Sequence, residues 1–276
     1  MKDILINENF QGLSVDILKG YVNSLNFYNL QREDVDFINK KLELDNRKSI
    51  QNLAIRFMRG YENYNKELKR IEKLYMFDKG FEDFKLIAGV DEVGRGPLAG
   101  PIVSAAVILD LDVINKDMIL YLNDSKKLTE AKREHLSNII KSKALAYSIS
   151  FCSNSDIDEK GIGFCNNEVF KKAVYSLDIK PNLILSDGYT IKGFESPNIA
   201  VIKGDAKSAS IAAASIIAKV YRDNLMKEQA EIYPHYDFDH NVGYGTRKHI
   251  EAIEKYGATS IHRVSFLNNI IGEKHL

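Results

Sequence analysis

The sequence predicts an α/β protein with a mixed five-stranded sheet flanked by helices, preceded by an N-terminal helical extension. Five short runs of apolar and β-branched residues lie between positions 85 and 203. Segments with apolar residues at three-to-four spacing separate and follow these runs. Strands that alternate with helices in this way are typical of a sheet whose faces are covered by helices.

The N-terminal part is expected to be a separate helical extension, residues 1–84, in front of a main domain, residues 85–276. Residues 1–45 carry five basic and eight acidic side chains, whereas residues 46–85 carry ten basic and six acidic ones. In the helical pattern of residues 48–84, the basic residues fall between the apolar positions. Two interpretations stay open for them, a solvated helix face or an accessory grip on nucleic acid. The second would use Arg47, Lys48, Arg56 and Arg59.

The first two strands are predicted at residues 85–91 and 101–109. The segment between them, EVGRGPLAG, is full of turn residues, so the two strands are expected to form a hairpin-like pair. Further apolar runs predict the remaining strands at residues 144–151, 182–186 and 198–203.

Four helices are predicted in the main domain, at residues 129–142, 168–179, 205–230 and 245–257. Their ends carry residues that start or stop helices. These are Thr129 as an N-cap, Pro181 and Pro234 beyond two C-termini, and Gly257 after the last helix. The long helix 205–230 is rich in Ala and other small residues.

Composition restricts the class of protein. A chain of 276 residues, 45% hydrophobic and 28% charged, is long enough to bury a sizeable core. Cys152 and Cys165 form neither a disulfide framework nor a CxxC zinc pair, and two free thiols are typical of a reducing cytosol. The N-terminus lacks a signal-peptide pattern, and no apolar run approaches the ~18 residues that span a bilayer. We therefore expect a cytoplasmic protein without a membrane anchor.

The charges balance, with 38 basic and 38 acidic residues. An excess of Lys and Arg is common in nucleic-acid-binding proteins. If this chain binds nucleic acid, it must therefore use local patches, and an acidic metal site would mask them in the total.

Four carboxylates are predicted to lie at the ends of secondary-structure elements. Asp91 and Glu92 close the first strand. Asp187 follows the strand at 182–186, and Asp205 opens the long helix. The strands that deliver Asp91 and Asp187 are expected to lie side by side, so the acids would repel and raise one another's pKa. Two alternatives stay open, because Asp205 can be a helix N-cap and Asp187 can belong to an ordinary turn.

A bound divalent cation would relieve this repulsion. Hard oxygen ligands without nearby Cys or clustered His favour magnesium or manganese over zinc. Two such ions about 4 Å apart form the phosphodiester-cleaving clamp of many nucleases. The pattern therefore predicts a metal-dependent site for phosphate chemistry.

The glycine-rich segment 94–100 contains G-x-G-x-x-A, but it leads into a β-branched strand instead of the helix that a dinucleotide fingerprint requires. Gly94 and Gly96 are expected instead to let the backbone approach a ligand, with Arg95 near a phosphate. Tyr244, flanked by two glycines, is expected to stack on a sugar or base.

Two further segments are candidates for phosphate contacts. Residues 124–128, DSKKL, precede a helix and are either a cap with solvated lysines or a phosphate contact. The pair His262-Arg263 is a second candidate. The histidines His235, His240, His249 and His262 show no convincing metal spacing.

Seven blocks of the sequence, in order, resemble the signature blocks of the ribonuclease HII family. The first is AGVDEVGRGPLAGPIVSAAVIL (88–109), and the others are DSKKL (124–128), LILSDG (183–188), KGDAKSASIAAASIIAKVYRD (203–223), YP (233–234), GYGT (243–246) and IHRVSF (261–266). The resemblance covers about residues 85–266, and seven blocks in register make it very specific. Some bacterial members carry an N-terminal helical extension, to which residues 1–84 look similar.

The resemblance implies a ribonuclease H-like fold and an endoribonuclease that cuts the RNA strand of RNA–DNA hybrids. It also implies nicking 5′ of ribonucleotides embedded in duplex DNA, the first step of ribonucleotide excision repair. Two Mn²⁺ or Mg²⁺ ions are expected, one on Asp91, Asp187 and Asp205 and one on Asp91 and Glu92, leaving 3′-OH and 5′-phosphate ends. The alternative is a non-catalytic hybrid-binding module of the same fold, which would gain from losing acids that face phosphates.

The family's catalytic, metal-binding carboxylates map onto Asp91, Glu92, Asp187 and Asp205. Its loop that senses the ribose 2′-OH maps onto Gly94, Arg95 and Gly96, and its junction-reading tyrosine maps onto Tyr244. Ser125 and Lys126 are expected to contact substrate as well. Asp223 is a rival for the fourth carboxylate, but it lies about five helical turns beyond Asp205. The implied partner is nucleic acid, bound by a monomer.

Overall fold

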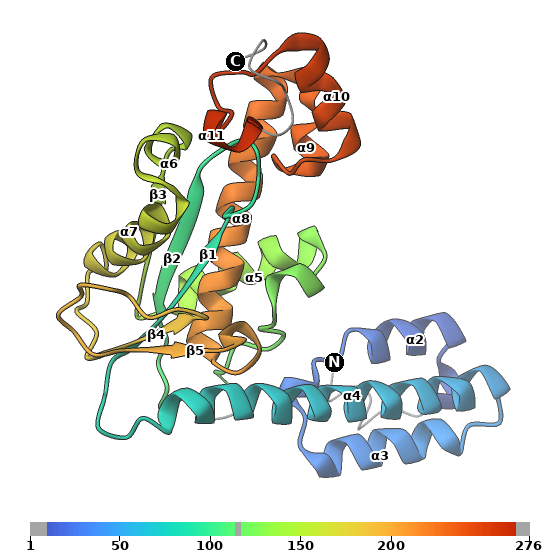
Figure 1. Ribbon diagram of the computed structural model, residues 1–276. Coiled ribbons are helices and arrows are strands. Elements are labelled where there is room, and N and C mark those ends of the chain that lie inside the picture. Colours follow the sequence, from blue (N-terminus) through green and yellow to red (C-terminus); the bar gives the residue numbers. More distant parts are fainter. Residues whose placement is uncertain (1–9, 114–116, 269–276) are drawn as a thin grey trace. The chain divides into compact units, whose positions relative to one another are not determined.

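The computed structural model describes residues 10–113 and 117–268, and the chain divides into two compact units (Figure 1). One unit comprises Met1–Glu72 with Ile114–Leu120, and the other comprises Lys73–Val113 with Tyr121–Leu276. The long helix α4 (Lys48–Lys79) contributes residues to both units. The boundary at residue 84 that the sequence suggests stays a prediction.

The first unit is helical. It contains α2 (Val15–Asn23), α3 (Arg32–Glu43) and most of α4, with the short 3₁₀ turns η1 (Phe10–Gly12) and η2 (Phe27–Asn29). Apolar residues of all three helices form its core, among them Leu18, Ile38 and Phe57.

Arg47 stabilises this unit from within. Its guanidinium lies 2.6 Å from the carboxylate of Asp45 and donates to the main-chain oxygens of Phe10 and Leu13. Arg47 is therefore a structural residue, which weakens the interpretation of this side chain as a nucleic-acid contact.

The second unit contains the predicted mixed sheet. Its strands are β1 (Ile87–Val93), β2 (Ile102–Ile108), β3 (Ala146–Cys152), β4 (Leu183–Asp187) and β5 (Asn198–Val201), in the order β3-β2-β1-β4-β5. Strand β1 pairs antiparallel with β2 and parallel with β4, while β2–β3 is antiparallel and β4–β5 parallel. The five predicted strands and the hairpin-like first pair are confirmed.

Helices cover both faces of this sheet. They are α5 (Glu130–Lys143), α6 (Asn154–Lys160), α7 (Ile162–Tyr175), α8 (Ala209–Ile232), α9 (Phe238–Asn241), α10 (Arg247–Tyr256) and α11 (Val264–Leu267). Short 3₁₀ turns lie at η3 (Ser125–Lys127), η4 (Gly204–Ala206) and η5 (Pro234–Tyr236). Among the described residues, no helix combines the length and apolarity needed to span a membrane.

Successive side chains of β1 point to opposite faces of the sheet, and a different helix covers each face. Ala88 and Val90 pack in one core cluster with Phe170 of α7. On the other face α8 runs across β1 and β2 (Figure 1). A Cβ on Gly89 would lie 2.1 Å from the main-chain carbon of Ser210, so glycine at this position allows α8 to lie directly on the sheet.

Three predicted helix boundaries were wrong. The long helix begins at Ala209 and not at residue 205, because Ser208 caps it by accepting a hydrogen bond from the Ile211 amide. The helix predicted at 168–179 runs from Ile162 to Tyr175. Helix α6 was not predicted, although Ser153 and Asp156 form a capping box at its start.

Candidate active site

The centre of the site is the carboxyl end of two neighbouring strands. The parallel register of β1 and β4 pairs Val90 with Ser186, so the next residues along, Asp91 and Asp187, occupy adjacent positions. Asp91 faces α8, where the nearby Ser215 hydroxyl acts to lower the pKa of Asp91. The prediction that the strands delivering Asp91 and Asp187 lie side by side is confirmed.

Burial and mutual repulsion raise the pKa values of these acids. Burial, followed by the charges of Glu92 and Asp187, holds the pKa of Asp91 well above its usual range. Burial and the charge of Asp187 raise the pKa of Glu92 to about 7, although Arg95 and Lys126 act in the opposite direction. In the described part of the chain, no basic side chain forms an ion pair with either acid.

Asp205 reaches the same cluster from the turn η4. Burial raises its pKa, and the nearby charges of Asp187 and Asp124 raise it further. The turn is tied to β4, since the Gly204 amide donates to Asp187 Oδ1 at 2.6 Å. Asp205 is not the N-cap of α8, because Ser208 has that role. The helix-cap alternative for Asp205 is therefore wrong.

The residues present fit hard divalent cations. Four carboxylates meet at one end of the sheet, and cations such as Arg95 and Lys126 act on them only at a distance. No three of these four acids have ligand atoms within 4.8 Å of one another. Magnesium is typically held by one or two carboxylates, with water and substrate phosphate completing its shell. Four acids that do not enclose an ion suit this kind of magnesium binding better than they suit a site in which every ligand comes from the protein.

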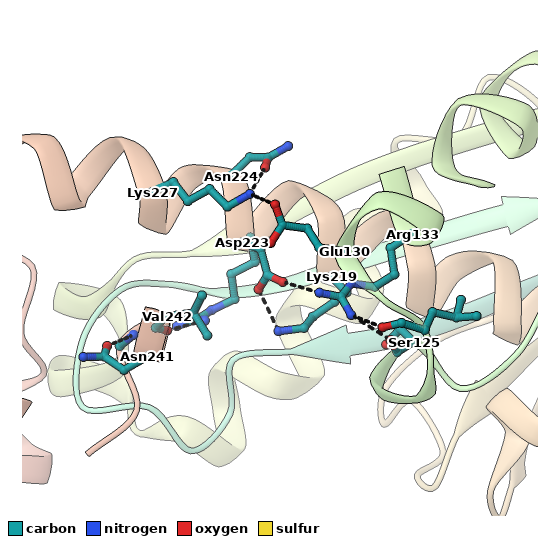
Figure 2. Close-up of polar contacts among 12 residues, drawn as sticks. Ser125, Glu130, Arg133, Lys219, Asp223, Asn224, Lys227, Asn241 and Val242 are labelled. Atoms are coloured by element: carbon teal, nitrogen blue, oxygen red, sulfur yellow. Dashed lines mark hydrogen bonds and ion pairs between the residues drawn. The ribbon is translucent and has the colours of Figure 1, made fainter. Parts of the chain in front are cut away.

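Asp223, the rival for the fourth carboxylate, belongs to a different network (Figure 2). It lies in α8 between two cations, 2.7 Å from Lys219 Nζ and 3.4 Å from Arg133 Nη2. Arg133 also donates to the main-chain oxygens of Ser125 and Leu128, and so holds the turn η3. Asp223 is neutralised by these cations, which supports Asp205 as the fourth acid.

One other group of ligating side chains occurs in the described chain. Asp237, Asp239 and His240 have ligand atoms within 4.8 Å of one another. His240 Nδ1 already contacts both acids, and Lys248 lies near Asp237. The group is largely exposed, and nothing in it points to a bound ion.

The two glycines of the loop after β1 have different reasons to be glycine. Gly94 has a φ of +88°, and a Cβ there would lie 2.2 Å from Arg222 Nε. A Cβ on Gly96 would meet nothing nearer than Tyr244 Cε1 at 3.9 Å. Gly94 is thus required by the fold itself, whereas the space above Gly96 is open to a ligand.

Two buried arginines hold this loop by its carbonyl groups. Arg263 donates to the main-chain oxygens of Gly94, Arg95 and Gly100 at 2.6–3.1 Å. Arg222 donates to those of Ala99, Pro101 and Val242 at 2.8–3.1 Å. Arg263 and its neighbour His262 are at most 1% exposed, so the predicted phosphate contact of this pair was wrong.

The other predicted substrate residues differ in their exposure and contacts. Arg95 donates to Tyr189 Oη at 2.7 Å and lies over that ring. Tyr244 is 42% exposed. Lys126 is exposed, whereas Ser125 is buried with its hydroxyl 3.0 Å from that of Ser215. Contacts of these residues with substrate stay predictions.

Comparison with known proteins agrees with this architecture. A sequence model described as Ribonuclease HII matches residues 88–269, and one described as Ribonuclease HII N-terminal domain matches residues 26–82. The Ribonuclease HII of Clostridium beijerinckii is 57% identical over 97% of this chain and 100% of that protein. That of Clostridium perfringens strain 13 is 56% identical over 96% and 97%.

The chain belongs to the ribonuclease HII family. It is therefore a ribonuclease H enzyme, an endoribonuclease of RNA–DNA hybrids. The non-catalytic alternative loses its support, since the relatives are named as ribonucleases over nearly their whole length.

Solved structures show the same ribonuclease H-like fold. Ribonuclease H2 of Pyrococcus horikoshii OT3 has a TM-score of 0.58 and 30% identity, covering 67% of this chain and 96% of that one. RNase HII of Archaeoglobus fulgidus, solved in a complex with PCNA, has a TM-score of 0.56 and 25% identity, covering 65% and 93%. The predicted fold is confirmed.

Sequence reasoning missed several residues of this ribonuclease HII site. Ser215, whose hydroxyl acts on the pKa of Asp91, lies in the small-residue run of α8, where nothing in the sequence distinguishes it from its neighbours. Asp124, close to Asp205, was considered only as a cap or phosphate neighbour. The loop-holding roles of Arg222 and Arg263 have no local signal, since their partners lie more than 100 residues away in the chain, apart from Val242.

Proposed function

We propose that this ribonuclease HII nicks duplex DNA on the 5′ side of embedded ribonucleotides and also cuts the RNA strand of longer hybrids. The products would be 3′-OH and 5′-phosphate ends, as ribonucleotide excision repair requires. The observation that carries the proposal is the convergence, beside an open glycine loop, of four carboxylates that form no ion pair with any described residue. We place the enzyme in the cytoplasm, acting as a monomer.

The carboxylates would hold two divalent ions, Mg²⁺ or Mn²⁺. Asp91, Asp187 and Asp205 would hold one ion, and Asp91 and Glu92 the other. Bound there, the ions would supply charge stabilisation at the phosphate and lower the pKa of water.

Positive charge beside the acids would orient the phosphate backbone. Arg95 and Lys126 are close enough to lower the pKa of Glu92, yet neither forms an ion pair with it in the described chain. Both side chains are exposed. They are thus available to phosphate oxygens on either side of the cut.

The loop and Tyr244 would select the ribonucleotide. Arg263 engages the Gly94 and Arg95 oxygens, while the Arg95 and Gly96 amides bond no other described group. Amides at this loop can donate to the ribose 2′-OH, the group that distinguishes RNA from DNA. Tyr244 would stack on the next sugar, which is unobstructed when it is deoxyribose. Together these two interactions would recognise an RNA-to-DNA step.

The test is cleavage of a labelled DNA duplex that contains one ribonucleotide, with the cut mapped to single-nucleotide resolution. We expect a single nick 5′ of the ribonucleotide in Mn²⁺ or Mg²⁺, none in EDTA, and none in the matched all-DNA duplex. Cutting of a long hybrid without any cutting of the single-ribonucleotide duplex would reject the proposed substrate range. Products with a 3′-phosphate would reject the proposed chemistry.

We propose further that the extension, residues 1–84, binds phosphates of the duplex through the exposed Arg56 and Arg59. Replacing both by Gln should reduce the slope of log affinity against log salt by about 0.9 for each phosphate that is no longer neutralised. Arg47→Gln is the control, because it should lower stability and leave the slope unchanged. An unaltered slope in the double variant would favour a solvated helix face.

A further inference from the structure

Two buried histidines lie behind the loop that carries Tyr244. His249 is in α10 and His262 precedes α11, and both are at most 1% exposed. Their Nε2 atoms are 3.0 Å apart, with the rings of Tyr236 and Phe238 around them. This distance is that of a hydrogen bond, so one nitrogen carries a hydrogen and the other accepts it.

The outer nitrogens decide the direction of this bond. His249 Nδ1 lies 2.8 Å from the main-chain oxygen of Tyr244, which only accepts, so this nitrogen carries a hydrogen. His262 Nδ1 lies 2.8 Å from the main-chain nitrogen of Thr259, which only donates, so this nitrogen is bare. A neutral imidazole has one N–H. The chain of donors therefore runs from Thr259 through His262 and His249 to Tyr244.

Both rings are neutral in this arrangement. Burial lowers the pKa of His249, and burial with the neighbouring His249 lowers the pKa of His262 to about 4. Protonation of either ring would place two N–H groups against each other, or an N–H against the Thr259 amide. The geometry thus admits one tautomer at each histidine.

The end of this chain is the backbone of Tyr244. The Tyr244 amide donates to the Asn241 oxygen, and the Tyr244 oxygen also accepts from the Thr246 amide. The preceding residue, Gly243, accepts from the amides of Leu98 and Ala99. Since the Tyr244 ring is half-exposed, its direction depends on how this backbone is held.

We propose that His249 and His262 are positioning residues for Tyr244, forming a neutral pair of fixed tautomers that holds its carbonyl group and so directs its ring over Gly96. This inference rests on the proposed function, in which Tyr244 reads the junction between ribonucleotide and DNA. The histidines act through Tyr244 and touch no substrate.

Two substitutions at His249 separate the functions of its two nitrogens. The amide nitrogen of Asn can take the place of Nδ1, whereas the amide oxygen of Gln can take the place of Nε2. His249→Asn therefore keeps the donor to Tyr244 and loses the acceptor for His262. His249→Gln keeps the acceptor and loses the donor. Both remove the ring, so they are matched for the loss of packing.

The measurement, on the full chain, is the ratio of kcat/KM on a single-ribonucleotide duplex to kcat/KM on a long hybrid. We expect this ratio to fall about fivefold in His249→Gln, the usual effect of removing one hydrogen bond, and to stay near wild type in His249→Asn. Added to Tyr244→Ala, His249→Gln should lower the ratio no further. Equal ratios in the two His249 variants would overturn the inference.

A second measurement does not depend on activity. Long-range ¹H–¹⁵N spectra of the wild-type chain at about pH 7 should show His249 protonated at Nδ1 and His262 at Nε2. His249→Gln, but not His249→Asn, should shift the ring resonances of Tyr244. Opposite tautomers, a charged ring or unshifted Tyr244 signals would overturn the inference. If Tyr244→Ala leaves the ratio unchanged, the proposed junction-reading function of Tyr244 is rejected. The positioning of Tyr244 by the two histidines is then tested by the spectra alone.

Discussion

The proposed site has an acidic end, at Asp91 and Glu92, and a proposed recognition end, at the loop of residues 94–101, and buried charge is stabilised differently at the two ends. Asp91 is buried and Glu92 is half-buried beside Asp187, with no cation paired to either in the described chain. Arg222 and Arg263 are also buried and also lack a paired acid among the described residues, but each donates to three main-chain oxygens. The cations are satisfied by the fold, whereas the anions are not.

This difference indicates whether each end acquires all its interaction partners on folding or only when ligands bind. Buried polar groups with full sets of partners are rigid before any ligand arrives. Buried like charges remain unfavourable until an opposite charge binds. We infer that the recognition loop is prebuilt and that the acidic end is completed by its cations and substrate. Substitutions at each end can test the two halves of this contrast separately.

The largest effect is expected at the acidic end, from Asp91→Asn. The variant loses a ligand charge shared by both proposed ions, and kcat should fall about a thousandfold or more. Because a repelling acid is removed, the metal-free melting temperature should stay equal or rise. The matched control is the exposed Asp178→Asn, which should change neither quantity. Near-normal turnover of Asp91→Asn in magnesium would refute the metal assignment.

The second prediction concerns the recognition end. Arg263→Met leaves the oxygens of Gly94, Arg95 and Gly100 buried without their donor. The free energy of unfolding should drop by about 2–4 kcal/mol, as measured by chemical denaturation. Arg95→Met, at an exposed position, should change stability by less than about 0.5 kcal/mol. Similar stability for both variants would mean that the loop is not prebuilt by Arg263.

The third prediction uses pH without metal. A carboxyl group whose folded pKa is raised stabilises the fold below its ordinary pKa, and this stabilisation is lost as pH rises through the folded value. Glu92, with a pKa raised to about 7, and Asp91, whose pKa is raised by burial, act in this direction. His249 and His262, whose pKa values are lowered, act in the opposite direction up to about one pH unit above the ordinary histidine pKa of about 6.5.

Relative to Glu92→Gln, which shares the two histidines, the metal-free free energy of unfolding of the wild-type chain should therefore fall by about 1–3 kcal/mol between about pH 5 and 8. Mn²⁺ should reverse this fall. Asp78→Asn provides a control, since burial raises the pKa of Asp78 only to about 6 and its carboxylate accepts from the Ser210 amide at the start of α8. This variant should keep both the fall and its reversal. A difference in metal-free stability between wild type and Glu92→Gln that grows with pH in favour of wild type would contradict the description of the acidic end.

The acidic end could be predicted from the sequence, whereas the contacts that hold the glycine loop could not. The five strands and the convergence of Asp91 with Asp187 follow from short apolar runs, whose polar ends necessarily lie at sheet edges. The predicted start of α8 was wrong because Ser208, three residues after Asp205, caps the helix, while Asp205 lies in the turn η4 that the Gly204 amide ties to β4. The role of Arg263 could not be predicted, since its partners are more than 160 residues distant.

The glycines of the loop give a further case. In the sequence, Gly94 and Gly96 appear equivalent, as positions where the backbone approaches a ligand. The structure separates them, because a side chain on Gly94 would collide with Arg222, while one on Gly96 would meet only open space below Tyr244. One glycine thus belongs to the prebuilt scaffold and the other to the surface where the substrate is proposed to bind.

The last prediction, with the smallest effect, is that Gly96→Ala separates recognition from folding. Gly96 does not have a positive φ, and the nearest atom to its Cβ would be Tyr244 Cε1 at 3.9 Å. Stability and Mn²⁺ affinity should therefore stay within about 0.5 kcal/mol of wild type. The added methyl group would occupy the space between loop and ring where the sugar is proposed to lie. We expect kcat/KM to fall roughly tenfold on both the single-ribonucleotide duplex and the long hybrid.

Gly94→Ala is the variant with which Gly96→Ala should be compared. Its Cβ would lie 2.2 Å from Arg222 Nε, at a φ of +88°. This variant should lose stability as well as activity, because the strained backbone and the displaced arginine disturb the scaffold itself. If Gly96→Ala also loses stability, the space above it is part of the fold. If Gly96→Ala keeps full activity on both substrates, the loop does not approach the sugar, and recognition of the 2′-OH must come from elsewhere.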